Sequence, residues 1–250
     1  MSLRTSDRDT GELHAGRYVA LFSVLIAIFL AMPFLGPGRS GGLLLEILLL
    51  SVLLSSLRAI WQNRWIVLAA VVPGLGLFAS PNWGLIEASN ASLVVSSLGL
   101  VGFLAVIIVA LCLDVYRARS VTFSTILGAC SIYLLIGVFW FGVFGSIEAA
   151  QPNSFVFAET HPADVEAQVD PEASAEVAVS FLERRQLFYY TFVTLSTLGY
   201  GDVRPVSELA RVYATLAAVM GQLFLAILVA RLVGMHASRG AGAIGPSSSA

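Results

Sequence analysis

Two glycines, Gly199 and Gly201, are separated by a single residue in the segment Thr194-Leu-Ser-Thr-Leu-Gly-Tyr-Gly-Asp202. Glycine adopts positive φ at little cost, so this spacing lets neighbouring residues of an extended segment reverse hand. In an ordinary β-strand, successive carbonyl groups point to opposite sides. When every second residue reverses its hand, successive carbonyl groups can point to the same side. A row of carbonyl oxygens that faces one way can replace the water around a cation. The plainer alternative is a glycine-rich turn between two helices.

The composition of the chain excludes a soluble protein. Of the 250 residues, 57% are apolar and only 12% are charged, and the mean hydropathy is +0.84. Soluble domains have roughly 45–50% apolar and about 25% charged residues. A globular core cannot enclose this excess of apolar side chains, so the excess must face lipid. The 14 basic residues, all arginines, nearly balance the 16 acidic ones, and we expect no nucleic-acid partner.

Six apolar runs indicate helices that cross a bilayer core about 30 Å thick. We therefore expect an all-α integral membrane protein with about six transmembrane helices. The runs, of which the second and third are short, are Arg17–Leu35, Leu43–Leu57, Trp65–Ser80, Ser92–Leu113, Val121–Ile147 and Glu208–Val233. A further run at 187–196 is too short to cross and ends at glycines, so we expect a re-entrant segment between the fifth and sixth spans.

The arginines predict the orientation of these spans, because cytoplasmic loops retain positive charge. With the N-terminus inside, nine arginines lie on the cytoplasmic side and five on the outer side. Both chain ends are then cytoplasmic, and the expected location is the cell membrane, as a multi-pass protein.

The segment Thr197-Leu-Gly-Tyr-Gly-Asp202 resembles the pore loop of potassium channels, whose filter reads Thr-Val-Gly-Tyr-Gly. The resemblance is close over residues 187–235 and only architectural across the first four spans. It implies a channel subunit for passive K⁺ conduction and not an enzyme. Leu198 and Ser196 depart from the usual valine or isoleucine and threonine. Because a bulkier side chain at 198 must pack behind the filter, a weakly selective monovalent cation channel is an alternative.

The resemblance also assigns roles to individual residues. Carbonyl groups line the K⁺ sites at Thr197, Leu198, Gly199 and Tyr200, the Thr197 hydroxyl closes the innermost site, Gly201 completes the filter, and Asp202 holds the outer mouth. Support for the filter is expected from Tyr189, Tyr190, Thr194 and Ser196. No metal other than permeant K⁺ and no cofactor is expected.

The same resemblance divides the chain into parts with separate tasks. A cytoplasmic N-terminus (1–16) precedes a four-helix membrane domain (17–120) and a pore domain (121–233), and a disordered cytoplasmic tail follows (234–250). The expected pore domain comprises an outer helix (121–147), an acidic extracellular turret (148–186), a pore helix (187–197), the filter (197–202) and an inner helix (208–233). One chain supplies one filter strand, so the resemblance implies a homotetramer in the lipid bilayer.

Two features bear on gating. Gly221 lies near the middle of the last span, where it is either a hinge or a close contact between helices. The fourth span, Ser92–Leu113, contains no arginine, so we expect weak or absent voltage dependence. With no ligand-sensing domain in the tail, regulation by a ligand would need a separate partner.

Carboxylates outside the filter invite two further interpretations. The segment 148–183 holds eight carboxylates and no base, which is typical of a solvated turret that concentrates cations. A helix is expected to begin there at Asp170 and extend to about Arg185. Glu46 falls within the second span, and its place near the outer end favours the interface over an intramembrane role.

Two other function classes compete with a channel. An ion-coupled transporter would be expected to show internal repeats and intramembrane charges, and neither is evident beyond Glu46. An intramembrane hydrolase would need a serine and a histidine on facing spans, and no such pair is present among the six runs.

Overall fold

Helices make up most of the structure, a computed structural model that describes residues 6–34, 39–60, 64–79, 89–117, 122–157 and 175–241. The α-helices are α1 (Ser6–Ala31), α2 (Arg39–Ile60), α3 (Arg64–Gly74), α4 (Asn90–Arg117), α5 (Phe123–Ala150), α7 (Ala175–Leu195) and α8 (Glu208–Ala241). Two 3-10 helices, η1 (Met32–Phe34) and η2 (Leu75–Ala79), follow α1 and α3. The strands β1 (Phe155–Phe157) and β2 (Val203–Pro205) pair antiparallel. The expected all-helical class is confirmed.

Three helices among the described residues are long and apolar enough to cross a membrane. They are Ala91–Arg117, Phe123–Ala150 and Glu208–Arg231, which correspond to the expected fourth, fifth and sixth spans. Tyr18–Ala31, Glu46–Leu57 and Arg64–Leu77 are shorter apolar helices at the positions of the first three. The first three spans and the re-entrant segment therefore stay predictions.

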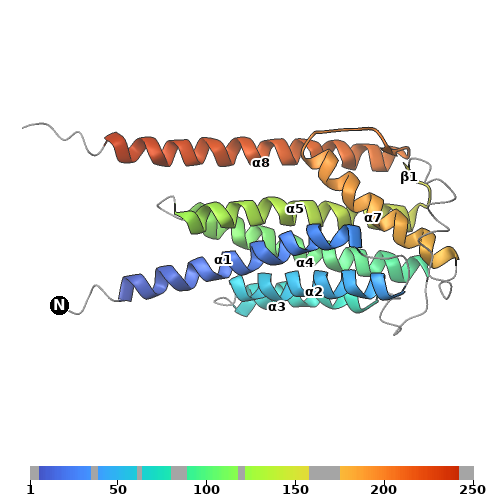
Figure 1. Cartoon of the computed structure of the whole chain (residues 1–250), viewed down its shortest axis with the longest axis horizontal. Helices are drawn as coiled ribbons and strands as arrows, with labels where there is room; N and C mark the ends of the chain where they lie inside the picture. The colour runs from blue at the N-terminus through green and yellow to red at the C-terminus, as the bar shows by residue number, and fades with distance from the viewer. Residues whose placement is uncertain are drawn as a thin grey trace, which may run out of the picture.

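The helices α1 to α5 lie side by side, and α8 runs along one edge of this bundle (Figure 1). There α8 packs on α5, while α7 crosses obliquely between them and contacts both. After α7 the chain turns back to the end of the bundle from which α7 came, and α8 begins there (Figure 1). The helix α1 begins, and α8 ends, at the opposite end of the bundle.

Small residues and aromatic rings set the packing of the bundle. A Cβ on Gly99 would lie 2.7 Å from the carbonyl oxygen of Pro73 and 2.8 Å from the Cα of Gly76, so α3 and η2 approach the backbone of α4 closely. On the other side, the ring of Phe29 from α1 lies edge-on against Phe188 and Phe192 of α7, at 5.2 and 4.3 Å between centroids. The first helix therefore supports the helix that leads into the glycine segment.

Several helix bounds differ from the expected ones. The helix α7 already begins at Ala175, so it merges the end of the expected turret (148–186) with the expected pore helix (187–197). Its expected start at Asp170 lies outside the described residues. The tail was expected to be disordered from Gly234, but α8 continues to Ala241. No proline interrupts residues 234–241, so a long helix can continue past its apolar part.

Candidate functional site

The glycine segment begins at the C-terminal end of α7, which closes with a Schellman motif. The amide of Leu198 donates to the carbonyl of Val193 at 2.9 Å, and the amide of Thr197 donates to the carbonyl of Thr194 at 3.0 Å. This motif needs a residue in the left-handed region at the position of Thr197, where glycine is usual. Thr197 takes φ 62° instead. A β-branched residue there stores strain of about 1–3 kcal/mol, which the surrounding contacts must offset.

Positive φ recurs at every second residue beyond this point. Thr197 is followed by Gly199 at 59° and Gly201 at 81°. The expectation that both glycines adopt positive φ is confirmed, and a threonine joins the pattern. A Cβ on either glycine would meet nothing within 4 Å in this chain, so glycine is needed there for its φ and not for space.

The side chains between these positions face away from the chain's own core. Leu198 is 58% exposed and Tyr200 is 66% exposed. Large apolar side chains are seldom left exposed to water, and this chain provides little cover for these two.

The hydroxyl of Thr197 is held by the last long helix. The Nε2 amide of Gln222 on α8 donates to Thr197 Oγ1 at 3.0 Å, and that hydroxyl donates to the carbonyl of Ser196 at 2.7 Å. Sequence reasoning missed Gln222, although a signal was present. It is the one amide side chain in the apolar stretch between Leu216 and Ala230.

Gly221 lies where α8 passes the end of α7. A Cβ at this position would overlap the carbonyl oxygen of Leu195, and α8 is helical without interruption through Gly221. Of the two roles considered for this glycine, the geometry provides direct support for the close helix contact. Its role as a hinge stays a prediction.

The two expected tyrosine supports point in different directions. The side chain of Tyr189 is exposed and hydrogen-bonds Asp202, close to Tyr200. Tyr190 is buried and hydrogen-bonds Thr194. Its ring lies 5.4 Å from those of Phe144 on α5 and Phe155 on β1. Tyr189 therefore contacts the far end of the glycine segment at Asp202, while Tyr190 contacts its start at Thr194 and anchors α7 in the core.

The other expected residues have local roles in the backbone. Ser196 Oγ donates to the carbonyl of Phe192 at 2.6 Å, which helps to close the last turn of α7. Asp202 Oδ1 accepts from the amide of Val203 at 3.0 Å, which fixes the exit of the glycine segment.

The far end of the segment is tied to the chain that leaves α5. In the β1–β2 ladder, Phe155 pairs with Pro205 and Phe157 with Val203. The carboxylate of Glu148 holds the first of these strands, because it accepts from the amides of Asn153 and Phe155 at 2.7 and 3.1 Å. Glu148 belongs to the expected solvated turret, and its role as a backbone acceptor was not foreseen.

The expected ligands for a cation at this site are carbonyl oxygens, and this stays a prediction. Among the described residues, no group of three or more histidine, cysteine, aspartate or glutamate side chains could hold a metal ion. The negative end of the α7 dipole points toward the glycine segment, which favours a cation there.

Comparison with protein families decides the class of this site. Residues 173–237, which span α7, the glycine segment and most of α8, match the family model described as "Ion channel". These residues are therefore similar to ion channels, and we call residues 173–237 the ion channel module. The expected resemblance to potassium channels is confirmed over this segment, and the match favours a channel over an enzyme. No curated protein and no solved structure was found to match the chain.

The ion channel module ends inside α8 and begins just before the described part of α7. The four helices α1 to α4 lie outside it. The roles of single residues in the glycine segment, including ion binding, stay predictions.

Proposed function

We propose that this protein is the subunit of a potassium-selective channel that conducts K⁺ passively through a tetrameric pore in the cell membrane. One observation carries this proposal. Positive φ at Thr197, Gly199 and Gly201 gives the backbone the alternation that a row of same-facing carbonyls requires. This alternation occurs inside the matched ion channel module.

The surface of α8 supports an assembly of several chains. In the apolar part of α8 only 17% of the residues are buried, compared with 61% in α5. Leu198 and Tyr200 are also largely exposed. A ring of filter strands around a common axis would cover these side chains and bring four carbonyls to each ion site. We therefore propose a homotetramer with both termini cytoplasmic.

The proposal is tested by ion flux into liposomes that contain the purified protein. Wild-type protein is expected to carry K⁺ and not Na⁺. Gly199→Ala is expected to abolish the flux, because alanine strains at φ 59°. Gly234→Ala is the matched control, since a Cβ there would meet nothing within 4 Å. Equal fluxes of both ions in wild type, or undiminished flux in Gly199→Ala, would contradict the proposal.

A weakly selective monovalent cation pore is the second candidate, and Leu198 is the observation that favours it. Its side chain is longer than the usual valine and is largely exposed within the chain, so four copies must be accommodated behind the filters. If this packing loosens the ion sites, Leu198→Val raises the K⁺/Na⁺ permeability ratio. An unchanged ratio would remove the reason for this candidate.

A further inference from the structure

A buried acidic side chain and an arginine line the same small cavity between the first helices and α7. Glu46, on α2, is only 4% exposed. Its carboxylate therefore faces the inside of the protein, and its expected place near the membrane interface stays a prediction. Burial of a charged side chain is unfavourable unless another group compensates it.

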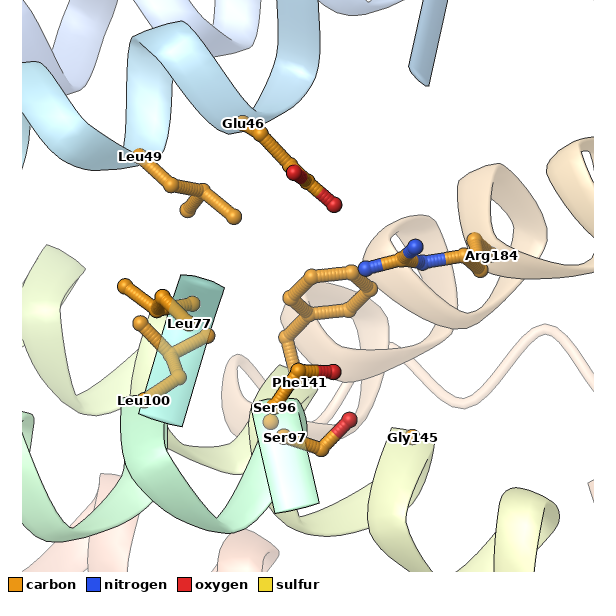
Figure 2. Close-up of a pocket in the computed structure, with 10 residues that line it drawn as sticks. Glu46, Leu49, Leu77, Ser96, Ser97, Leu100, Phe141, Gly145 and Arg184 are labelled. Carbon is orange, nitrogen blue, oxygen red and sulfur yellow. The ribbon is translucent and has the colours of Figure 1, made fainter. Parts of the chain in front are cut away.

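Arg184 faces Glu46 from the other side of this cavity. Figure 2 shows the guanidinium of Arg184 and the carboxylate of Glu46 directed toward the same space, with the ring of Phe141 beneath them. Burial lowers the pKa of Arg184, and the charge of Glu46 acts in the opposite direction and favours the charged arginine. The charge of Glu46 therefore offsets part of the cost of placing the half-buried Arg184 at this cavity.

The cavity has a volume of about 30 Å³, with Glu46 and Arg184 on its wall and the serines Ser96 and Ser97 of α4 nearby. This is enough for one water molecule, which needs two to four polar partners. Gly142 and Gly145 of α5 also line it, and small residues there leave the space open. Helices α2, α4, α5 and α7 therefore converge on one pair of charges.

We propose that Glu46 and Arg184 form a buried charge pair that positions α7, and with it the selectivity filter, against the helices α2 to α4. The inference rests on the proposed function, because the filter is what α7 would position. Arg184 lies in the same helix as Val193 and Thr194, whose carbonyls hold the start of the glycine segment. A shift of α7 along its axis would reach that segment directly, since α7 is one continuous helix.

The test uses a double-mutant cycle on full-length protein in liposomes, with Glu46→Gln, Arg184→Gln and the double variant. The readout is the K⁺/Na⁺ permeability ratio from reversal potentials. Loss of folded channels lowers the total current but leaves this ratio unchanged. Each single variant is expected to lower the ratio by about threefold or more, and the double variant no further, because paired residues act non-additively.

Arg185→Gln is the matched control, because Arg185 is the next residue on α7 and lines a different cavity. It is expected to leave the ratio unchanged. Independent losses that add in the double variant, or single variants with an unchanged ratio, would overturn the positioning role.

A second cycle with the same variants measures thermal unfolding of the purified protein. It separates failure of this inference from failure of the proposed function. If wild-type protein does not discriminate K⁺ from Na⁺, non-additive unfolding temperatures still support the charge pair. Additive unfolding temperatures would overturn the pair even in a protein that conducts K⁺ selectively.

Discussion

At the scale of single residues, the position that demands most explanation is Thr197. A threonine in the left-handed region is unfavourable, and glycine would close the Schellman motif without that strain. The observed contacts give a reason for threonine, because its hydroxyl links Gln222 on α8 to the carbonyl of Ser196. Backbone strain at a residue whose hydroxyl makes two hydrogen bonds is typical of functional sites.

Gln222→Leu is expected to weaken K⁺ binding at the innermost site. The variant removes the donor to Thr197 Oγ1, and one such hydrogen bond contributes about 0.5–1.5 kcal/mol, so affinity is expected to fall by about two- to tenfold. Calorimetric titration of the purified protein with K⁺ measures this. Thr215→Val is the matched control, since the Thr215 hydroxyl bonds only to the carbonyl of Arg211 among the contacts described. Equal affinity in Gln222→Leu and wild type would show that Gln222 has no part in the site.

At the scale of elements, the crossing of α7 and α8 depends on the absence of a side chain. Gly221→Ala is expected to destabilise the folded protein by about 1–3 kcal/mol, because its Cβ would overlap the carbonyl of Leu195 and force the two helices apart. Thermal unfolding in detergent measures the loss. Gly234→Ala, on the same helix but in open space, is expected to be neutral or slightly stabilising. If both variants unfold like wild type, the close contact does not exist.

The start of α7 should make stability depend on pH. Burial, and secondly repulsion from Glu148, raise the pKa of Glu183 above its ordinary value of 4.5. The folded state then binds the proton more tightly than the unfolded state. At low pH Glu183 is protonated and its burial costs little. The free energy of unfolding then falls as the pH rises from about 4.5 through the raised pKa of Glu183 in the folded state.

Glu183→Gln should remove this fall in stability as the pH rises above about 4.5. Thermal unfolding at a series of pH values compares it with wild type. Glu208→Gln, which changes an exposed carboxylate at the start of α8, is the control and should keep the fall. If Glu183→Gln loses stability with rising pH as steeply as wild type, Glu183 is not the group that causes the fall.

The elements also show how far sequence reasoning reaches. The expected starts of the fifth and sixth spans lie within two residues of α5 and α8, because long apolar runs and caps such as Ser207, whose hydroxyl accepts from the amide of Ala210, are local signals. The positive φ of Gly199 and Gly201 followed from glycine chemistry. In contrast, the β1–β2 pairing, the Gln222 contact and the approach of Arg184 to Glu46 join residues far apart in sequence. No local pattern encodes such contacts.

At the scale of the whole molecule, several contacts tie the first four helices to the ion channel module. Toward the C-terminal end of α8, Arg231 donates to the carbonyl of Tyr116 on α4 at 2.9 Å, and its guanidinium lies 5.3 Å from the centre of the Tyr116 ring. On α7, the ring of Phe29 from α1 contacts Phe188 and Phe192, and Glu46 of α2 shares a cavity with Arg184. The helices α1 to α4 thus contact both ends of the module, which suits them to brace the pore.

Bracing, and not voltage sensing, is the role that we propose for these helices, because the expected fourth span, Ser92–Leu113, carries no arginine. The span α4 contains one basic residue, Arg117, in its last turn. Moving one charge through the membrane field is worth about 2.3 kcal/mol per 100 mV, and a span without such charges gains nothing from the field. Planar-bilayer recordings are therefore expected to show a K⁺ conductance that changes little with voltage. A steep rise in conductance on depolarisation that persists after blocking ions are removed would contradict this prediction. The membrane field would then act on another element, and the role of α1 to α4 would include more than bracing.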